Sequence, residues 1–305
     1  MKVLVTGGAG FLGSFVVRRL LAEPSAEITV MLRPGSSSWR LDDCGSAFAT
    51  LACDLGDVDG VRAGLRAVRP DCVIHLAWDG VLARDRNDAR QQANVGAADH
   101  LVRGCADVGV TSWIGLGSQA EYGPQAGRLD ETAACAPTTR YGAAKLETFG
   151  AARRLCEAAG MRFAWLRPFS LYGPKDHPDW LIPYLIRAFL RGERPAVTAA
   201  AQVWDYLFVE DAADAIVRVA MREAARGVFN LGSGRPQALR SIVEALRDTV
   251  GPQLPVGFGE LPYRPDQVMH LEADIARLVE ATGWQPLTPM SEGLRQTVAW
   301  FRAHG

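Results

Sequence analysis

The sequence has no excess of charge of either sign and no hydrophobic run of membrane length. Its 305 residues carry 33 lysines and arginines against 34 aspartates and glutamates, a net charge of -1. We therefore expect neither nucleic acid nor a membrane surface as a partner. No apolar run approaches the roughly 20 residues of a membrane-spanning helix. Met1-Lys-Val-Leu-Val-Thr6 leads straight into a glycine turn, which leaves no room for a signal peptide, so we expect a cytoplasmic protein.

Cysteine is scarce and shows no metal-binding pattern. The six cysteines, at positions 44, 53, 72, 105, 135 and 156, form no Cys-x-x-Cys and no His-paired spacing. No metal site is predicted from them. We expect buried, reduced thiols.

Short apolar runs alternate with stretches of helical periodicity in the first half of the chain. This order predicts an α/β protein with a parallel sheet and crossover helices. The expected strands are 3–5, 28–32, 72–76, 113–116 and 162–166, and the expected helices are 11–23, 58–68, 89–108 and 141–159. After Pro168 the pattern loosens, with helices expected at 181–191, 211–221, 239–250 and 290–303, a short strand at 206–209 and a loop-rich stretch at 251–265.

A glycine turn joins the first expected strand to the first expected helix. Gly7-Gly-Ala-Gly10-Phe-Leu-Gly13 places glycines where a pyrophosphate site needs them. Gly7 permits a tight turn, Gly10 lets a diphosphate approach the backbone, and Gly13 allows close packing of helix and strand. The spacing of three glycines is weak evidence alone, but its position between strand and helix predicts a dinucleotide site. The predicted contacts of this turn are Gly7, Gly10, Phe11, Leu12 and Gly13.

A tyrosine, a lysine and a serine near the middle of the chain predict proton transfer at an alcohol or ketone. Tyr141 and Lys145 lie four residues apart in Tyr141-Gly-Ala-Ala-Lys145, on one face of an expected helix. The ammonium can therefore favour the phenolate. Ser118 opens the upstream segment Ser118-Gln-Ala-Glu-Tyr-Gly123 and can hydrogen-bond the substrate oxygen. Ser118, Tyr141 and Lys145 are the predicted catalytic residues.

Taken together, these motifs resemble the extended short-chain dehydrogenase/reductase family, in its nucleotide-sugar epimerase, dehydratase and reductase branch. The resemblance covers essentially the whole chain. It rests on Gly-x-x-Gly-x-x-Gly, on the serine, tyrosine and lysine, and on further ordered motifs: Asp54-Leu55, His75-Leu-Ala77, Leu166-Arg-Pro-Phe-Ser-Leu-Tyr-Gly-Pro174, Trp284 and Pro286.

The resemblance implies a Rossmann fold, a doubly wound parallel sheet, with a smaller C-terminal α/β substrate lobe. We expect the NAD(P)-binding domain at 1–167, with part of 205–235 returning to it, and the substrate lobe mainly at 168–305. It also implies cofactor contacts from Asp54, Leu55, Ala77, Tyr141 and Lys145, and a homodimer built from the helices at 89–108 and 141–159.

Arg33 bears on which nicotinamide is bound. It ends the second expected strand, about twenty residues past Gly13, where NAD enzymes tend to place an acid for the ribose 2′-hydroxyl. An arginine cannot accept that hydrogen bond but can pair with a 2′-phosphate. NADP(H) is therefore favoured, while a solvated Arg33 beside bound NAD(H) stays an alternative.

The positions after Ser118 argue against dehydration. In the family's 4,6-dehydratases an Asp-Glu pair follows the catalytic hydroxyl residue and performs the elimination. Here the pair is Gln119 and Ala120, which cannot act as acid and base. Glu121 falls one residue late and, in an extended segment, points to the opposite side.

The expected substrate residues depart from the family in two places. Ser170 stands where many relatives have an asparagine that contacts the diphosphate. Trp204 stands where many have a phosphate-binding arginine, and it either stacks on a base or sugar or packs in the core. Arg264, in Tyr263-Arg-Pro-Asp266, matches an arginine that grips the diphosphate in relatives. The predicted substrate contacts are Asp79, Ser118, Gln119, Ser170, Trp204 and Arg264, whereas His75 is expected to be structural.

The leading hypothesis is hydride transfer at C4 of a nucleotide-activated hexose or deoxyhexose. A 4-ketoreductase and a C4-epimerase use the same residues, and the sequence does not separate them, nor does it give the base, sugar or stereochemical outcome. An alternative is an NADPH-dependent reductase of a non-nucleotide ketone or aldehyde, which the replaced asparagine and arginine fit. A third is a non-catalytic NADP-sensing protein, although such relatives typically lack the tyrosine or lysine.

Overall fold

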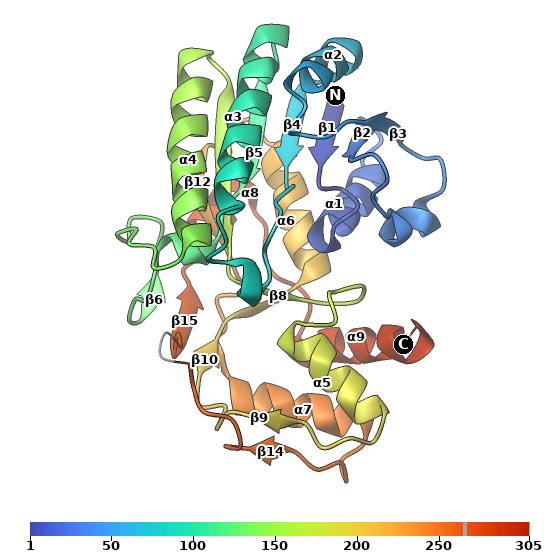
Figure 1. Cartoon of the computed structure of the whole chain (residues 1–305), viewed down its shortest axis with the longest axis vertical. Helices are drawn as coiled ribbons and strands as arrows, with labels where there is room; N and C mark the ends of the chain where they lie inside the picture. Colours follow the sequence, from blue (N-terminus) through green and yellow to red (C-terminus); the bar gives the residue numbers. More distant parts are fainter. Residues whose placement is uncertain (265–266, 305) are drawn as a thin grey trace.

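A seven-stranded parallel sheet forms the centre of the molecule (Figure 1). The computed structural model describes residues 1–264 and 267–304. The strand order is β12-β7-β5-β4-β1-β2-β3, which is the doubly wound arrangement that the sequence predicts. Its strands are β1 (Lys2–Thr6), β2 (Glu27–Leu32), β3 (Ala49–Ala52), β4 (Cys72–His75), β5 (Ser112–Leu116), β7 (Arg162–Pro168) and β12 (Gly227–Leu231). The direction of winding reverses between β1 and β4, and doubly wound sheets bind ligands in a crevice at the carboxyl ends of the strands at such a point.

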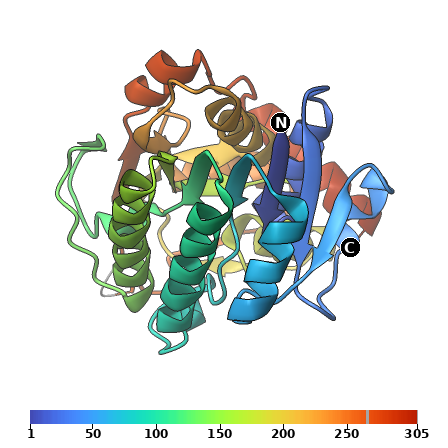
Figure 2. The same ribbon diagram turned by 90° about the horizontal axis from the view of Figure 1, so that it is seen from above.

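Helices cover both faces of this sheet, which explains why its strands are almost continuously apolar. Val3, Leu4 and Val5 of β1, for example, are wholly buried. Seen from above, α2, α3 and α4 stand in a row along one face (Figure 2). That face carries α2 (Val58–Val68), α3 (Gln91–Val108) and α4 (Arg140–Ala158), and the other carries α1 (Phe11–Leu21), α6 (Val209–Met221) and α8 (Ala276–Thr282).

A smaller lobe lies beyond the carboxyl ends of the strands (Figure 1). Three helices, α5 (Leu181–Leu190), α7 (Leu239–Val250) and α9 (Met290–His304), surround its apolar core. Its short strands pair as β8 (Ser170–Tyr172) with β11 (Tyr206–Phe208), as β9 (Ala196–Val197) with β14 (Gly257–Phe258), and as β13 (Gln237–Ala238), β10 (Val203–Trp204), β15 (His270–Ala273) and β6 (Arg128–Leu129) in one sheet. Apart from β11, strands of two to four residues are too short for the periodicity that sequence reasoning uses, and they were not predicted.

The chain passes between sheet and lobe more than once. After β11 it continues as α6 and β12, and β12 pairs in parallel with β7 at the edge of the large sheet. Buried Asp205 ties this passage together by accepting hydrogen bonds from the backbone N–H groups of Ser233 (2.7 Å), Gly234 (2.9 Å) and Ala273 (3.2 Å). The division at residues 167 and 168 stays a prediction.

The other expectations about the chain have mixed outcomes. Helix bounds agree to within about two residues; the helix expected to end at residue 23 ends at Leu21. All six cysteines are free, but Cys44 and Cys135 are only half-buried. Within residues 1–264 and 267–304, no helix combines the length and apolar character needed to cross a membrane. No metal-ligating cluster occurs in that part of the chain either.

A buried arginine caps the helix that leads into β12. Arg162, on β7, is 4% exposed. Its Nη1 donates to the carbonyl oxygens of Val219 (2.8 Å), Arg222 (2.9 Å) and Ala225 (3.0 Å), and its Nη2 donates to that of Ala220 (2.8 Å). Val219 and Ala220 belong to the last turn of α6, whose carbonyls lack donors from a following turn, and Arg222 and Ala225 follow it. The Arg162 side chain therefore links β7 to the C-terminal end of α6, the helix that precedes β12.

We expect Arg162→Met to lower the free energy of unfolding by about 3 kcal/mol, because several buried carbonyls lose a charged donor. Urea denaturation followed by circular dichroism measures the change. Arg222→Met, which removes an exposed side chain at the same helix end, is the control and should change stability by less than about 0.5 kcal/mol. Equal effects of the two substitutions would show that the Arg162 hydrogen bonds contribute nothing.

Candidate active site

The glycine turn between β1 and α1 lies directly against the end of β4. Gly7 has φ of +71°, and a Cβ there would lie 2.6 Å from the backbone nitrogen of Ala77. A Cβ on Gly13 would collide with the carbonyl oxygen of Gly7, so both positions require glycine. Gly10 donates its N–H to that same oxygen at 2.9 Å. Gly7, Gly10 and Gly13, three of the predicted cofactor residues, therefore lie together beside Ala77.

The first turn of α1 fits a diphosphate. Gly10 is its N-cap residue and provides no side-chain cap, and no acidic residue occurs in the first turn. The N–H groups of such a helix start are free for an anion. Phe11 and Leu12 form the first turn, with Leu12 buried below it.

The remaining predicted cofactor residues follow β2 and β3. Arg33 is exposed directly after β2, and its guanidinium has no hydrogen bond or ion pair with the described residues. Asp54 is exposed after β3 and accepts a hydrogen bond from the N–H of Gly56 at 2.8 Å. Leu55 beside it is half-buried. This edge of the crevice therefore presents one cation and one carboxylate to solvent.

Ser118, Tyr141 and Lys145 meet in one buried site. They are 7%, 8% and 3% exposed. Tyr141 is in the first turn of α4, whose N-cap Thr139 accepts a hydrogen bond from the N–H of Gly142 at 3.1 Å. The hydroxyl of Ser118 lies close enough to the phenol to favour its ionised form. The spacing in the sequence thus corresponds to an actual cluster beside the end of β5.

Lys145 is held between a carbonyl and an aromatic ring. Its Nζ donates to the carbonyl oxygen of Leu116 at 2.7 Å and lies 3.7 Å from the centroid of the Trp78 ring. Burial lowers the pKa of Lys145 to about 7, and the carboxylate of Glu121 opposes that shift only in part. The buried ammonium therefore loses its proton far more easily than that of a solvated lysine.

Burial also raises the pKa of the Tyr141 phenol. The guanidinium of Arg86 and the hydroxyl of Ser118 oppose the rise, while the carboxylate of Glu121 adds to it. The free protein therefore holds the phenol protonated, and cations around it decide how readily it ionises.

The segment after Ser118 is a turn, so the orientation that Glu121 would have in an extended segment does not apply. Ser118 is the N-cap of a 3₁₀ helix (Gln119–Glu121), and its Oγ accepts a hydrogen bond from the N–H of Ala120 at 3.1 Å. Glu121 folds back and accepts a hydrogen bond from the N–H of Ser118 at 2.9 Å. This is a capping box, which the pattern Ser-x-x-Glu could have revealed. Gln119 is half-buried on the same turn.

Glu121 is one of two important residues that sequence reasoning missed. Wholly buried, it pairs with Arg167 at 2.8 Å and accepts a hydrogen bond from Nε1 of Trp165 at 3.1 Å. The other is Arg86, whose guanidinium carbon lies 5.4 Å from the centroid of the Tyr141 ring. No motif in the sequence marks Arg86.

Two residues after β4 lie near this cluster. The Trp78 ring stands edge-on to Tyr141, with centroids 6.0 Å apart, and its Nε1 donates to Gln91 at 2.8 Å. The backbone of Asp79 is fixed by Asn94 through two hydrogen bonds, of 2.9 and 3.0 Å, while Asp79 itself is exposed. These hydrogen bonds fix the loop after β4 and hold the Trp78 ring beside Tyr141.

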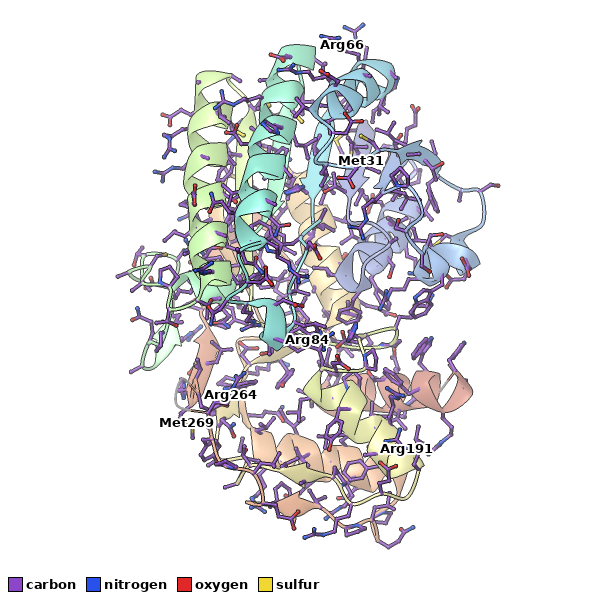
Figure 3. All side chains as sticks on the ribbon, in the orientation of Figure 1. Met31, Arg66, Arg84, Arg191, Arg264 and Met269 are labelled. Carbon is purple, nitrogen blue, oxygen red and sulfur yellow. The ribbon has the colours of Figure 1, made fainter. Side chains whose placement is uncertain are left out.

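The predicted substrate contacts in the lobe are more scattered. Ser170 begins β8 and is half-buried. Trp204 donates its Nε1–H to the carbonyl oxygen of Val268 at 2.8 Å and packs against Tyr206. Part of its side chain therefore belongs to the apolar core of the lobe. Arg264 is exposed on the loop that precedes β15, away from the large sheet (Figure 3). Pro265 and Asp266 of the same motif lie outside the described residues.

His75 has a structural role in this arrangement. Burial and, to a smaller extent, the charge of Lys145 together lower the pKa of His75 to about 3. Its Nδ1 is hydrogen-bonded to Oγ1 of Thr6 at 2.8 Å, and its ring lies 5.3 Å from that of Trp113. A neutral ring fixed between two strands joins β1 to β4.

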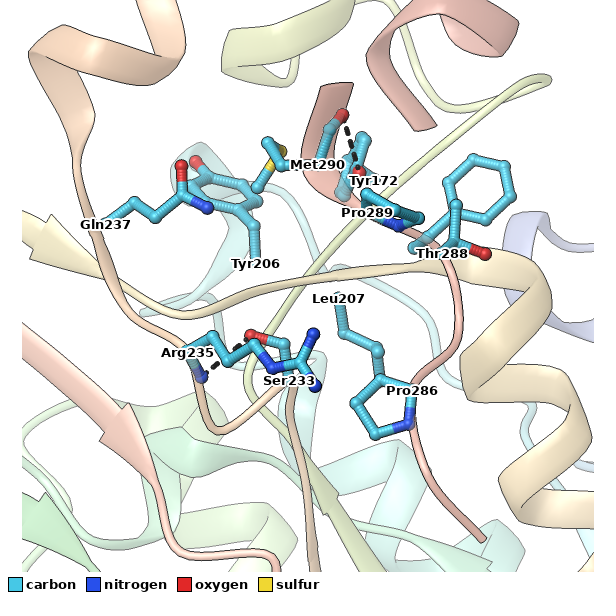
Figure 4. A pocket seen from close by; sticks show the side chains of 11 residues that line it. Tyr172, Tyr206, Leu207, Ser233, Arg235, Gln237, Pro286, Thr288, Pro289 and Met290 are labelled. Carbon is cyan, nitrogen blue, oxygen red and sulfur yellow. Dashed lines mark hydrogen bonds between the residues drawn. The ribbon is translucent and has the colours of Figure 1, made fainter. Parts of the chain in front are cut away.

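A cavity in the lobe is separate from this cluster. It has a volume of about 200 Å³, and Ser118, Tyr141 and Lys145 do not line it (Figure 4). Its walls are Tyr172, Tyr206, Leu207, Phe208, Ser233, Arg235, Gln237, Pro286, Thr288, Pro289 and Met290.

Residues 3–232 match the NAD dependent epimerase/dehydratase family. Among curated relatives, a dTDP-glucose 4,6-dehydratase of Neisseria meningitidis serogroup B is 29% identical, over 98% of this chain and 93% of the relative. A UDP-glucose 4-epimerase of Mycolicibacterium smegmatis is 28% identical, over 99% of both chains.

Solved structures agree with these matches. The UDP-glucose 4-epimerase of Thermotoga maritima with UDP-glucose superposes with a TM-score of 0.90 at 26% identity, covering 100% of this chain and 99% of that one. The UDP-glucose 4-epimerase of Thermus thermophilus in complex with NAD has a TM-score of 0.89 at 27% identity, covering 100% of both.

The buried Lys145 should cost stability. An unfolded lysine titrates near 10.5, whereas folding lowers the pKa to about 7. The destabilisation of the folded state by the buried ammonium is therefore largest below pH 7, and it decreases as the pH rises toward 10.5. We expect Lys145→Met to raise the free energy of unfolding by about 2 kcal/mol at pH 6 and by much less at pH 10.

Urea unfolding at both pH values tests this dependence, with Lys2→Met at an exposed position as the control. A Lys145→Met gain that is absent at pH 6, or that is the same at pH 6 and 10, would contradict it.

Proposed function

The chain belongs to the NAD-dependent epimerase/dehydratase family, and we propose that it is an NAD(P)-dependent oxidoreductase acting at C4 of a nucleotide-activated hexose or deoxyhexose. The observation that carries the proposal is one buried cluster of Ser118, Tyr141 and Lys145, at the crevice edge that also holds the glycine turn. Relatives named as UDP-glucose 4-epimerase and dTDP-glucose 4,6-dehydratase support the general kind of reaction.

Each residue of the cluster has a defined task in this proposal. Tyr141 takes the proton of the sugar hydroxyl when the sugar is oxidised and returns it when a ketone is reduced. Ser118, in the same buried cluster as the phenol, aligns the substrate oxygen beside it. Lys145 contributes positive charge next to the phenol. A bound nicotinamide supplies hydride transfer; Gly7, Gly10 and Gly13 would hold its diphosphate, and Arg33, Asp54, Leu55 and Ala77 its remaining parts.

Oxidation and reduction alone, without dehydration, are the proposed chemistry. Gln119 and Ala120 carry no acid or base. Glu121 is fully buried against Arg167 and Trp165, so it has no access to a substrate. Gln119, Ala120 and the buried Glu121 therefore provide no proton carrier for the elimination of water.

Arg33 favours NADP(H) and, with it, the 4-ketoreductase over the C4-epimerase. Its exposed guanidinium is unengaged by the described residues, as a partner for a 2′-phosphate must be. The epimerase is the alternative within the same chemistry, and the Thermus thermophilus relative is a complex with NAD. A second candidate, NADPH-dependent reduction of a non-nucleotide ketone or aldehyde, is favoured by Ser170 and by Trp204, whose Nε1 is already bonded to Val268.

The proposed substrate is a nucleotide-diphosphate sugar, with Asp79 and Gln119 near the sugar. Ser170 and Arg264 would face the diphosphate, and Trp204 would stack on the base or sugar. The Thermotoga maritima relative is a complex with UDP-glucose. We also propose a homodimer formed through α3 and α4, which lie side by side on one face of the sheet (Figure 2).

Incubation with UDP- and dTDP-hexoses and with their 4-keto derivatives, with and without NADPH, tests the function. Stoichiometric NADPH loss identifies a reductase, and interconversion of sugars without net NADPH loss identifies an epimerase. Tyr141→Phe should lower turnover by about 100-fold or more, because the phenol carries the proton. The control is Tyr184→Phe, a change at an exposed tyrosine of the lobe. Absence of any reaction with every nucleotide sugar would refute the proposal.

For the cofactor, Arg33→Ala should weaken NADPH binding by about tenfold or more, since a charge-assisted contact contributes about 1.5–3 kcal/mol. NADH binding should not change. Quenching of protein fluorescence measures both dissociation constants, and Arg103→Ala on the exposed face of α3 is the control. Tighter binding of NADH than of NADPH by the unmodified protein would rule out the preference.

A further inference from the structure

Arg86 occupies an unusual position beside the predicted proton carrier. It lies in the loop between β4 and α3, and its carbonyl oxygen accepts a hydrogen bond from the backbone N–H of Tyr141 at 2.8 Å. Its guanidinium carbon is 5.4 Å from the Tyr141 ring centroid and 5.9 Å from that of Trp180. The cation therefore lies against the phenol ring and also contacts the lobe through the N-cap residue of α5.

The guanidinium of Arg86 has no counter-ion, unlike its neighbours. Arg84 pairs with Asp179 at 2.6 Å, and Arg90 pairs with Asp88 at 3.3 Å. Among the described residues no carboxylate pairs with Arg86, and its buried Nε has no hydrogen-bond partner. A buried N–H left without a partner costs free energy, so its retention at this place calls for a role.

Lys145 alone is a weak source of charge for the phenol. Its Nζ lies 5.9 Å from the Tyr141 ring centroid, and it is already committed to Leu116 and to the Trp78 ring. With a pKa lowered to about 7, it also loses its proton far more easily than a solvated lysine. A guanidinium stays charged at every physiological pH.

We propose that Arg86 supplies the permanent positive charge that stabilises the Tyr141 phenolate during proton transfer. The inference rests on the proposed role of Tyr141 as the proton carrier. Three charged groups face the phenol: Lys145 from α4, Glu121 from the 3₁₀ helix and Arg86 from the β4–α3 loop. Glu121 opposes ionisation, and Nζ of Lys145, 5.9 Å from the ring centroid, is held by Leu116 and Trp78. The guanidinium of Arg86, at 5.4 Å, therefore tips the balance toward the phenolate. Arg86 is thus a positioning residue that acts through Tyr141.

The pH dependence of turnover tests this role. Oxidation of the sugar needs the phenolate, so its rate falls on the acid side as the phenol protonates. Arg86→Gln should shift that acid limb upward by about one pH unit, because an opposite charge at this range changes an ionisation equilibrium by that order. Arg86→Lys keeps a charge and should retain most of the unmodified profile. Arg84→Met, two residues away on the same loop but paired with Asp179, should leave it unchanged.

A spectroscopic titration makes the test independent of the substrate. The absorbance of tyrosinate near 295 nm is followed against pH in the unmodified protein with NAD or NADP bound, and the Tyr141→Phe titration is subtracted. Ionisation of Tyr141 should move to higher pH in Arg86→Gln and stay close to the original in Arg86→Lys. An unchanged midpoint in Arg86→Gln overturns the inference even where turnover confirms the proposed function. A shifted midpoint without turnover on any nucleotide sugar sustains the inference and overturns the function.

Discussion

The buried pair of Glu121 and Arg167 is the interaction on which the site depends. It fixes the turn after β5, because the same carboxylate accepts the backbone N–H of Ser118. Arg167, at the end of β7, also lies 4.5 Å from the ring centroid of Tyr122. The pair therefore fixes the ends of β5 and β7, the turn and Ser118 relative to one another. A buried ion pair of this kind rarely adds net stability over apolar packing, so its value here lies in geometry.

That geometry also sets the electrostatics around Tyr141, the proposed proton carrier. Glu121 is negative and close to the phenol, and burial further disfavours the phenolate. Positive charge must therefore come from the other sides, where Lys145 and Arg86 lie. The protein accepts an ammonium with a pKa lowered to about 7 and an unpaired guanidinium at the same place. Both are unfavourable for folding, which is typical of a site arranged for chemistry.

The sheet and the glycine turn could be predicted from the sequence because each follows from local rules. Buried parallel strands are apolar throughout, and Gly7 and Gly13 stand where a Cβ would strike the backbone. The turn at Ser118 was missed because the spacing of Glu121 from Ser118, which fits a capping box, was not considered. The role of Arg86 could not be predicted from the sequence. Its contact with Tyr141 depends on how the long loop between β4 and α3 packs against the first turn of α4. The short strands of the lobe depend in the same way on tertiary pairing.

The pairing of β12 with β7 has a consequence for how the molecule holds together. The chain leaves the sheet after β7, builds part of the lobe, and only then returns to cover the open side of that strand. A fragment that stopped after β7 would present a full row of unpaired N–H and C=O groups, which is a template for association with other chains. The half of the chain that ends at β7 therefore needs β12 to complete its sheet. An exchange of that half between proteins would have to include residues up to 231. Nascent chains share this exposure until residues 227–231 emerge from the ribosome.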